Sequence, residues 1–272
     1  MTRIAVIGGG KIGEALIAGL VAAGRPAKDL VVAERHPGRG KELADEYGLR
    51  VTADTADAAD GVDVVVIAVK PGDVGSVLGD LSKVQGAGDR LIVTLAAGHP
   101  ASFYEGLMPA GTPVVRVMPN TPMLVNEAMC AVSAGRFATP EHVTTVVDML
   151  AVVGKVVEVP ESQLDAVTAV SGSGPAYVFL VVEAMVDAGV GLGLTRQLAT
   201  ELAVQTVRGA GVLMSDSGLS PVDLRASVTS PGGTTAEAIR ELDSNGLRGA
   251  FYQAMRACAA RSAELGAASA KP

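Results

Sequence analysis

The segment RIAVIGGGKIGEAL, residues 3–16, constrains the fold of this chain more than any other stretch. Gly8, Gly10 and Gly13 form a Gly-x-Gly-x-x-Gly pattern that directly follows an apolar strand candidate and opens a helical stretch. Such glycines permit a tight turn, let the backbone approach a pyrophosphate and allow a helix to pack closely on a strand. The pattern is weak by itself, but its place at the head of a strand–helix–strand pattern predicts a Rossmann-type dinucleotide site.

The first 160 residues alternate short β-branched runs with helical or turn-rich segments. Near-continuous apolar runs such as VDVVVIAV (62–69) are what a sheet buried on both faces requires. The alternation predicts a parallel, right-handed, doubly wound sheet. The strand candidates lie at residues 3–8, 29–34, 62–69, 90–96, 113–119, 129–135 and 155–160.

After residue 160 the strand signal disappears and helix-start signals replace it. These signals are Ser162 with Asp165, Pro175, Thr195 and Ser220 with Pro221. We therefore predict an α/β fold in two parts. Residues 1–160 form a dinucleotide-binding Rossmann domain with a doubly wound sheet, and residues 161–272 form an all-helical domain.

Charge and cysteine usage exclude several classes of partner. The net charge is −7 and no Lys/Arg cluster is present, which makes nucleic acid and anionic membranes poor partners. Cys130 and Cys258 lack metal-type spacing, so no metal site is expected. The N-terminus runs straight into a strand without a signal-like segment, so we expect the cytoplasm. Because Glu183 and Asp187 interrupt the apolar stretch 176–194, we predict a buried helix there rather than a membrane span.

The sequence leaves open which nucleotide the site prefers and whether Lys70 contacts it. Glu34 ends the second strand candidate, where an acid would bind a ribose 2′-hydroxyl, and Arg35 follows at once and would suit a 2′-phosphate. The first indicates NAD and the second NADP, and both side chains could also be ordinary surface charges. Lys70, in the segment AVKP (68–71), either faces the nucleotide phosphates or is an ordinary exposed lysine.

The second half of the chain lacks the usual proton donors. Residues 161–272 contain no histidine, and after Lys155 the next lysine is Lys271. Carbonyl reduction normally uses such a group, so the composition argues against a β-hydroxyacid dehydrogenase with its lysine in the second domain. A site made of N–H groups and hydroxyls suits hydride delivery to a C=N bond, because a cyclic imine can enter already protonated.

Two small-residue loops are candidates for that site: SGSGPAY (171–177) and SPGGTT (230–235). Each precedes a helical stretch, and two helix N-termini with exposed N–H groups would bind a small anion such as a carboxylate. Thr234 and Glu237 have the spacing of a capping box, which would occupy Thr234 and leave the hydroxyl of Thr235 free. The alternative is that both loops are only helix caps.

Five motifs occur in the order seen in pyrroline-5-carboxylate reductases: IGGGKIGEAL, AVKP, RVMPNTP (116–122), SGSGPAY and VTSPGGTTAEAIREL. The chain resembles this family over nearly its whole length. The resemblance implies reduction of 1-pyrroline-5-carboxylate to L-proline with NAD(P)H, and a helical domain that builds a homodimer, often assembled into a decamer. A β-hydroxyacid dehydrogenase and a non-catalytic NADPH-binding regulator remain as alternatives, and the two intact loops argue against a regulator.

The resemblance also implies roles for individual residues. Thr235 is the catalytic group that contacts the imine nitrogen, and the amides around Gly233 and Thr234 hold the substrate carboxylate. The expected substrate-binding residues are Ser171, Ser173, Ser230, Gly232, Gly233, Thr234 and Thr235. The expected cofactor-binding residues are Gly8, Gly10, Lys11, Ile12, Gly13, Glu34, Arg35, Ala68, Val69, Lys70, Pro71, Ala96, Ala97 and Asn120.

The chain departs from the family pattern near the adenosine end of the cofactor. Glu34 and Arg35 replace the small or neutral residues common after the second strand, and Thr55 stands where an asparagine is common. We expect NADPH as the cofactor with NADH as the alternative, and these departures bear on the 2′-phosphate contacts rather than on the reaction.

Overall fold

The computed structural model describes residues 2–269, which fall into two compact units. One unit runs to Ser173 and takes up the chain again at Ala257, and the other is Gly174–Arg256. The first unit therefore includes a short helical segment beyond residue 160 and the last part of the final helix.

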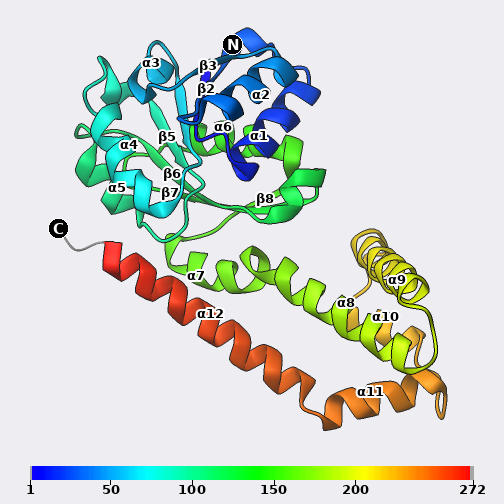
Figure 1. Ribbon diagram of the computed structural model, residues 1–272. Helices are drawn as coiled ribbons and strands as arrows, with labels where there is room; N and C mark the ends of the chain where they lie inside the picture. The colour runs from blue at the N-terminus through cyan, green and yellow to red at the C-terminus, as the bar shows by residue number, and fades with distance from the viewer. Residues whose placement is uncertain (1, 270–272) are drawn as a thin grey trace. The chain divides into compact units, whose positions relative to one another are not determined.

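An eight-stranded sheet organises the first unit, in the order β3-β2-β1-β4-β5-β6-β7-β8 (Figure 1). Its first six positions follow the Rossmann order, with the crossover point between β1 and β4. The strands are β1 (Ile4–Ile7), β2 (Leu30–Ala33), β3 (Arg50–Thr52), β4 (Val64–Ile67), β5 (Leu91–Thr94), β6 (Val114–Met118), β7 (Ala128–Ala134) and β8 (Gly154–Glu158).

The structure confirms all seven strand candidates and differs from the prediction at two places. β3 was not predicted, because three edge residues are too few to show a pattern. β7 pairs antiparallel to β6, whereas the other neighbours are parallel. Only the short segment 119–127, which contains the turn Thr121–Val125, separates β6 from β7, and a parallel return needs a crossover of a dozen residues or more.

Two apolar cores, one on each face of the sheet, hold the first unit together. In β1, Ile4 and Val6 point into one core with α1, α2 and α6, while Ala5 and Ile7 point into the other with α3, α4 and α5. This is why the strands read as unbroken apolar runs. The helices are α1 (Lys11–Ala22), α2 (Pro37–Tyr47), α3 (Thr55–Ala59), α4 (Val74–Leu81), α5 (Ala101–Leu107) and α6 (Pro140–Leu150).

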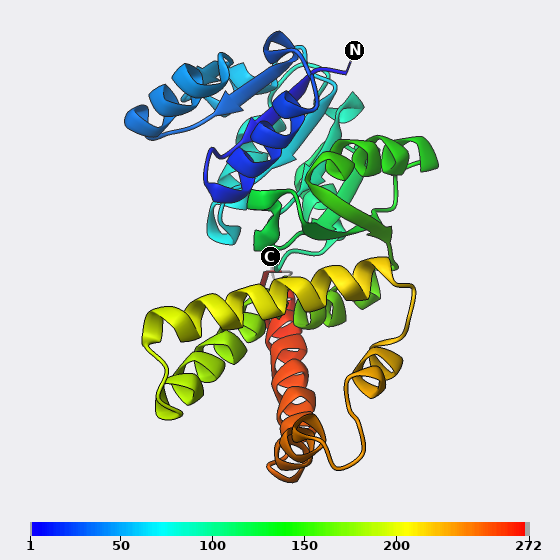
Figure 2. The same ribbon diagram turned by 90° about the vertical axis from the view of Figure 1, so that its right-hand side faces the viewer.

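The rest of the described chain is helical, as predicted. Thr195 and Ser220 cap their helices through side-chain oxygens that accept from Leu198 N–H and Asp223 N–H, both at 3.2 Å. Figure 2 shows α9 running beside α8. The elements are α7 (Leu164–Val167), a π-helical turn (Thr168–Gly172), α8 (Gly174–Gly191), α9 (Arg196–Asp216), α10 (Pro221–Ser227), α11 (Thr234–Ser244) and α12 (Leu247–Ser269).

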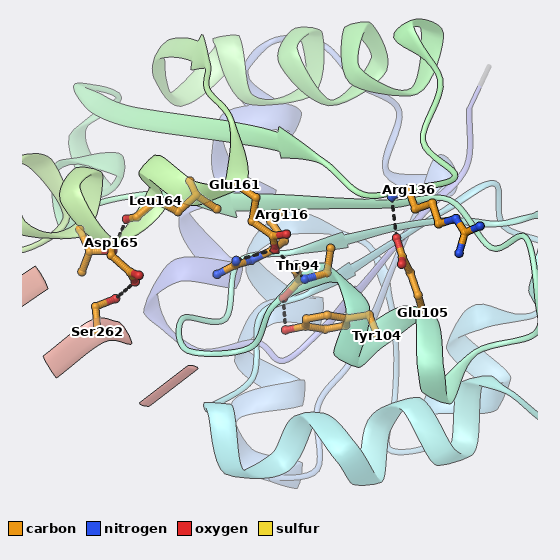
Figure 3. Close-up of polar contacts among 11 residues, drawn as sticks. Thr94, Tyr104, Glu105, Arg116, Arg136, Glu161, Leu164, Asp165 and Ser262 are labelled. Atoms are coloured by element: carbon orange, nitrogen blue, oxygen red, sulfur yellow. Dashed lines mark hydrogen bonds and ion pairs between the residues drawn. The ribbon is translucent and has the colours of Figure 1, made fainter. Parts of the chain in front are cut away.

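Of two further predicted helix starts, one is wrong and one is confirmed to within a residue. Ser162 caps no helix, since α7 follows Gln163, and Asp165 instead accepts a 2.6 Å hydrogen bond from Ser262 Oγ of α12 (Figure 3). Pro175 is the second residue of α8, which follows the π-helical turn almost without a break. Asp165 therefore bonds to a distant helix of the first unit instead of contributing to a local helix cap.

The apolar helix α8 is not buried within one chain, so the predicted burial requires a partner chain. Val186 is its only buried residue. By length and composition alone, the stretch Glu161–Gly191 could cross a membrane, but one such helix is weak evidence. The large exposed apolar side chains of α8 and α9 are Val178, Phe179, Leu180, Val181, Met185, Leu198, Leu202, Val204, Val212, Leu213 and Met214.

Candidate active site

The glycine turn between β1 and α1 has the shape that a pyrophosphate requires. Gly8 has φ +106°, and a Cβ there would meet the Ala68 carbonyl oxygen at 2.9 Å. A Cβ on Gly13 would lie 2.0 Å from the Gly8 carbonyl oxygen, whereas one on Gly10 would meet nothing within 4 Å. The turn is therefore closed around Gly8 and Gly13 and open at Gly10, where a ligand can approach the backbone.

The first turn of α1 faces this opening. Gly10 is the N-cap and offers no side-chain cap, so the first N–H groups of Lys11, Ile12 and Gly13 lack the usual side-chain acceptor. Free N–H groups and the positive end of the helix dipole favour an anion. The residues present thus fit the phosphates of a dinucleotide.

A cleft of about 970 Å³ lies at the carboxyl ends of β1, β2 and β4, where ligands bind in folds of this type. It brings together half of the predicted cofactor residues: Gly8, Gly10, Glu34, Arg35, Ala68, Val69 and Lys70. The remaining predicted cofactor residues do not line the cleft; some are adjacent to it along the chain and some lie in other segments. Lys11, Ile12 and Gly13 begin α1, Pro71 begins a short 3-10 turn, Ala96 and Ala97 follow β5, and Asn120 follows β6.

Sequence reasoning missed part of the cleft wall. Ala53 and Asp54 line it because they follow β3, the strand that the pattern did not reveal, and Thr55 follows them. Asp54 is the N-cap of α3 and accepts from Ala56 N–H at 2.8 Å. The sequence signal for this part of the wall was Asp54 before an alanine-rich run, a pattern that indicates a helix start. The other missed lining residues are Ile7, Ala33, His36, Ala56, Asp60, Asp73, Ser76, Val77, Asp80, Lys83 and Val84.

Glu34 is a built part of the cleft rather than a loose surface charge. Its Oε2 accepts from Gly9 N–H and its Oε1 accepts from His36 N–H, both at 2.9 Å. Two backbone donors therefore orient the carboxylate beside the glycine turn. Such a group suits a ribose hydroxyl and repels a phosphate at the same place.

Arg35 lies beside Glu34 and is paired. Its Nη2 is 3.1 Å from Asp73 Oδ1, and the two side chains are 68% and 40% exposed. Lys70 also lines the cleft and is exposed. The cleft therefore combines cations for phosphate groups with carboxylates that compete for them.

His99 joins two loops that carry predicted cofactor residues. Its Nε2 donates to the Pro71 carbonyl oxygen at 2.9 Å, and its ring stacks on Phe103 with 4.3 Å between centroids. The side chain is buried, at 7% exposure. His99 thus ties the loop after β4 to the loop that contains Ala96 and Ala97.

A buried tyrosine near this loop does not qualify as the missing proton donor. Tyr104 hydroxyl lies 2.6 Å from Thr94 Oγ1 at the end of β5 (Figure 3). Burial raises the pKa of Tyr104 to about 12, with a smaller opposing effect from the Thr94 hydrogen bond. The side chain is fully enclosed, so it anchors α5 to the sheet.

Asn120 and Ser171 meet within the first unit. Asn120 Nδ2 donates to the Ser171 carbonyl oxygen at 3.0 Å, and its Oδ1 accepts from Met129 N–H at 2.9 Å. The structure therefore joins a predicted cofactor residue to a predicted substrate residue. Ser173 Oγ lies 3.3 Å from Cys258 Sγ.

The segment SGSGPAY is not a loop before a helix, so the predicted free helix start there is wrong. Residues 168–172 form a π-helical turn that follows α7, and Ser173 N–H donates to the Thr168 carbonyl at 2.8 Å. Ser171 Oγ donates to the Val167 carbonyl at 3.1 Å. π-helical turns often occur at functional sites.

The segment SPGGTT, in contrast, ends at a free helix N-terminus in the second unit. Gly232 has φ +68°, which favours glycine, and a Cβ on Gly233 would lie 2.7 Å from Ser230 Oγ and 3.1 Å from the Ser230 carbonyl oxygen, so the turn is tight at both positions. Gly233 N–H donates to the Ser230 carbonyl at 3.0 Å. The loop is a tight, glycine-dependent turn that leads directly into α11.

The capping box predicted for this loop is not formed. Gly233, not Thr234, is the N-cap of α11, and no side chain caps the helix. The Glu237 carboxylate bonds to Arg240 instead of the N-cap. Among the described residues, the hydroxyls of Thr234 and Thr235 have no hydrogen-bond partner. Thr234 is exposed and Thr235 is half-buried. The N–H groups of the first turn are thus open to an anion, and both hydroxyls are unoccupied.

Comparison with known proteins assigns both parts of the chain. The family model "Pyrroline-5-carboxylate reductase dimerisation" matches residues 161–265, and "NADP oxidoreductase coenzyme F420-dependent" matches residues 3–98. A pyrroline-5-carboxylate reductase from Corynebacterium melassecola is 50% identical over 98% of this chain and 99% of its own length. One from Mycobacterium leprae is 50% identical over 97% of each chain.

Solved structures agree with the sequence relatives. A pyrroline-5-carboxylate reductase from Coxiella burnetii has a TM-score of 0.93 at 35% identity, covering 97% of this chain and 98% of its own. A Plasmodium falciparum pyrroline carboxylate reductase with NADP bound has a TM-score of 0.86 at 28% identity, with the same coverage. The sequence relatives and the solved structures match nearly the whole chain and the dimerisation model matches its helical part, so the chain belongs to the pyrroline-5-carboxylate reductase family.

Proposed function

We propose that this protein reduces the C=N bond of 1-pyrroline-5-carboxylate with NAD(P)H to give L-proline, the last step of proline biosynthesis. The observation that carries the proposal is the 50% identity, over 98% of this chain, to a protein named for that activity. The cleft and the free helix start of α11 supply the two kinds of site that the reaction needs.

The glycine turn and the cleft are the proposed cofactor site. The N–H groups at the start of α1 would hold the pyrophosphate, Lys70 would neutralise part of its charge, and Glu34 or Arg35 would meet the adenosine ribose. The nicotinamide, when bound, supplies the hydride. Asn120, Ala96 and Ala97 complete the proposed contacts.

The turn 230–235 is the proposed substrate site. The free N–H groups around Gly233 and Thr234 would hold the substrate carboxylate, and the hydroxyl of Thr235 would orient the imine nitrogen and relay a proton to it. The second unit contains no histidine or lysine, so these two common proton donors do not compete with the hydroxyl there. Ser230 and Gly232 shape the turn, and Ser171 and Ser173 remain proposed contacts near Asn120.

An assay of the purified protein with NADPH and NADH in parallel tests the proposal. We expect loss of absorbance of the reduced cofactor that depends on 1-pyrroline-5-carboxylate, and we expect L-proline as the product. A protein that binds the cofactor but forms no proline would disprove the proposed activity.

Arg35 is predicted to favour NADPH. Arg35→Ala should raise KM for NADPH on the order of tenfold and change KM for NADH little, because a guanidinium–phosphate contact is lost only with the former. Lys83→Ala removes another cation of the same cleft and serves as the control. Equal effects of Arg35→Ala on both nucleotides would remove Arg35 from the 2′-phosphate site.

Assembly is the next prediction. We propose a homodimer built by the helical part, with a decamer as its higher assembly. The matched dimerisation model and the exposed apolar surface of α8 and α9 support it, because a monomer rarely leaves so much apolar surface uncovered. Sedimentation at micromolar concentration should show no monomer, and a stable, active monomer would rule the proposal out.

Two further proposals concern the domain boundary and the cellular compartment. We propose residue 160 as the functional boundary between cofactor and substrate parts, since the dimerisation model begins at residue 161. The cytoplasm is the proposed compartment, and cell fractionation with an antibody to the protein checks it.

A further inference from the structure

Asp73 occupies a helix-capping position, but its side chain forms an ion pair instead of a cap. It is the N-cap of α4, where an aspartate normally accepts hydrogen bonds from the first N–H groups of the helix. Here its side chain makes no such bond, and its Oδ1 lies 3.1 Å from Arg35 Nη2. The carboxylate therefore reaches across from the loop after β4 to the residue that follows β2.

Arg35 is the cation at the position where Rossmann sites distinguish a ribose 2′-hydroxyl from a 2′-phosphate. The neighbouring Glu34 is held by Gly9 N–H and His36 N–H and gives Arg35 no hydrogen bond among the described residues. Asp73 is thus the partner that a 2′-phosphate would have to displace from Arg35.

We propose that Asp73 is a specificity-determining residue that lowers the preference for NADPH by competing with its 2′-phosphate for Arg35. The inference rests on the proposed use of both nucleotides. NADPH binding breaks the Asp73–Arg35 pair and brings negative charge close to the released carboxylate. NADH carries a hydroxyl at that place and leaves the pair intact.

The expected size follows from the exposure of the pair. Ion pairs as exposed as this one contribute little, so their removal should change relative affinity by about two- to fivefold. Asp73→Asn should lower the Kd for NADP⁺ by that factor and leave the Kd for NAD⁺ unchanged. The selectivity in kcat/KM should move in the same direction.

The experiment is a double-mutant cycle read by calorimetric binding of NADP⁺ and NAD⁺ to the substrate-free protein. Low ionic strength keeps surface charges from being screened. Asp73→Asn is measured alone and in the Arg35→Ala background, where it should no longer alter selectivity. Asp73→Ser, which retains a capping side chain, is expected to repeat the effect, and thermal unfolding verifies that each variant is folded.

Asp80→Asn is the matched control. Asp80 lines the same cleft and pairs with Lys83 at 3.6 Å, so its neutralisation removes the same charge without freeing Arg35. The proposal is overturned if Asp73→Asn shifts both nucleotides equally, if Asp80→Asn has the same selectivity effect, or if the effect persists without Arg35. Proline formation by the wild type is measured alongside, so that a failure of this inference is distinct from a failure of the proposed reaction.

Discussion

Replacing Thr235 by alanine is expected to lower kcat/KM for 1-pyrroline-5-carboxylate on the order of 10²-fold or more, if its hydroxyl relays a proton. The hydroxyl has no hydrogen-bond partner among the described residues, and Thr235 lies in the first turn of α11, which no side chain caps. Its loss should therefore remove a contact to the substrate and no contact that stabilises the fold. The loss should fall on kcat if the contact strengthens in the transition state, and on KM if it only anchors the substrate. Steady-state kinetics in both substrates measure this.

Thr234→Ala is the matched control for that prediction. The expected capping box would have made this change cost about 0.5–2 kcal/mol of stability. Because Gly233 is the N-cap and Thr234 caps nothing, we now expect the unfolding midpoint of both variants to stay near that of the wild type. Full activity of Thr235→Ala, or equal losses in cofactor and substrate binding, would contradict the role assigned to the hydroxyl.

Gly13→Ala is expected to have the largest effect on the first unit. Its Cβ would lie 2.0 Å from the Gly8 carbonyl oxygen, which is backbone and cannot move away as a side chain would. The turn between β1 and α1 must open, at a cost of about 3 kcal/mol or more in the free energy of unfolding. Denaturant unfolding and calorimetric binding of NADP⁺ should both show the loss.

Gly10→Ala separates stability from binding. The new Cβ meets nothing within 4 Å, so the free energy of unfolding should change little, but the methyl group stands where the turn is open to a ligand. We expect weaker NADP⁺ binding at nearly unchanged stability. If Gly10→Ala destabilised the protein as much as Gly13→Ala, the assignment of closed and open sides of the turn would be wrong.

Local signals were sufficient for most of the fold. Apolar β-branched runs predicted every strand that is buried on both faces, because burial itself selects those residues. The glycine pattern predicted the turn around Gly8 and Gly13, since no other residue fits there. Thr195 and Ser220 were recognisable as caps because a cap is a contact between residues three apart in the chain.

Other features depended on pairing choices that the local sequence pattern does not specify. The reversal of β7 followed from a short connection, and the edge strand β3 from pairing with β2. At the start of α11, Gly233 rather than Thr234 is the N-cap and Glu237 bonds to Arg240, which the spacing of Thr234 and Glu237 does not reveal. Spacing shows which local contacts are available but not which competing partner is preferred.

The family motifs, the division into strands and helices, and the two glycine-rich turns could be predicted from the sequence, because single segments encode the backbone conformations and burial on which they rest. Three contacts appear only in the folded chain: Asp73 pairs with Arg35, His99 joins two loops that carry predicted cofactor residues, and Asn120 meets Ser171. Each of these contacts joins residues that become neighbours only when the chain folds. Their formation depends on the three-dimensional packing around them, which a linear pattern does not record.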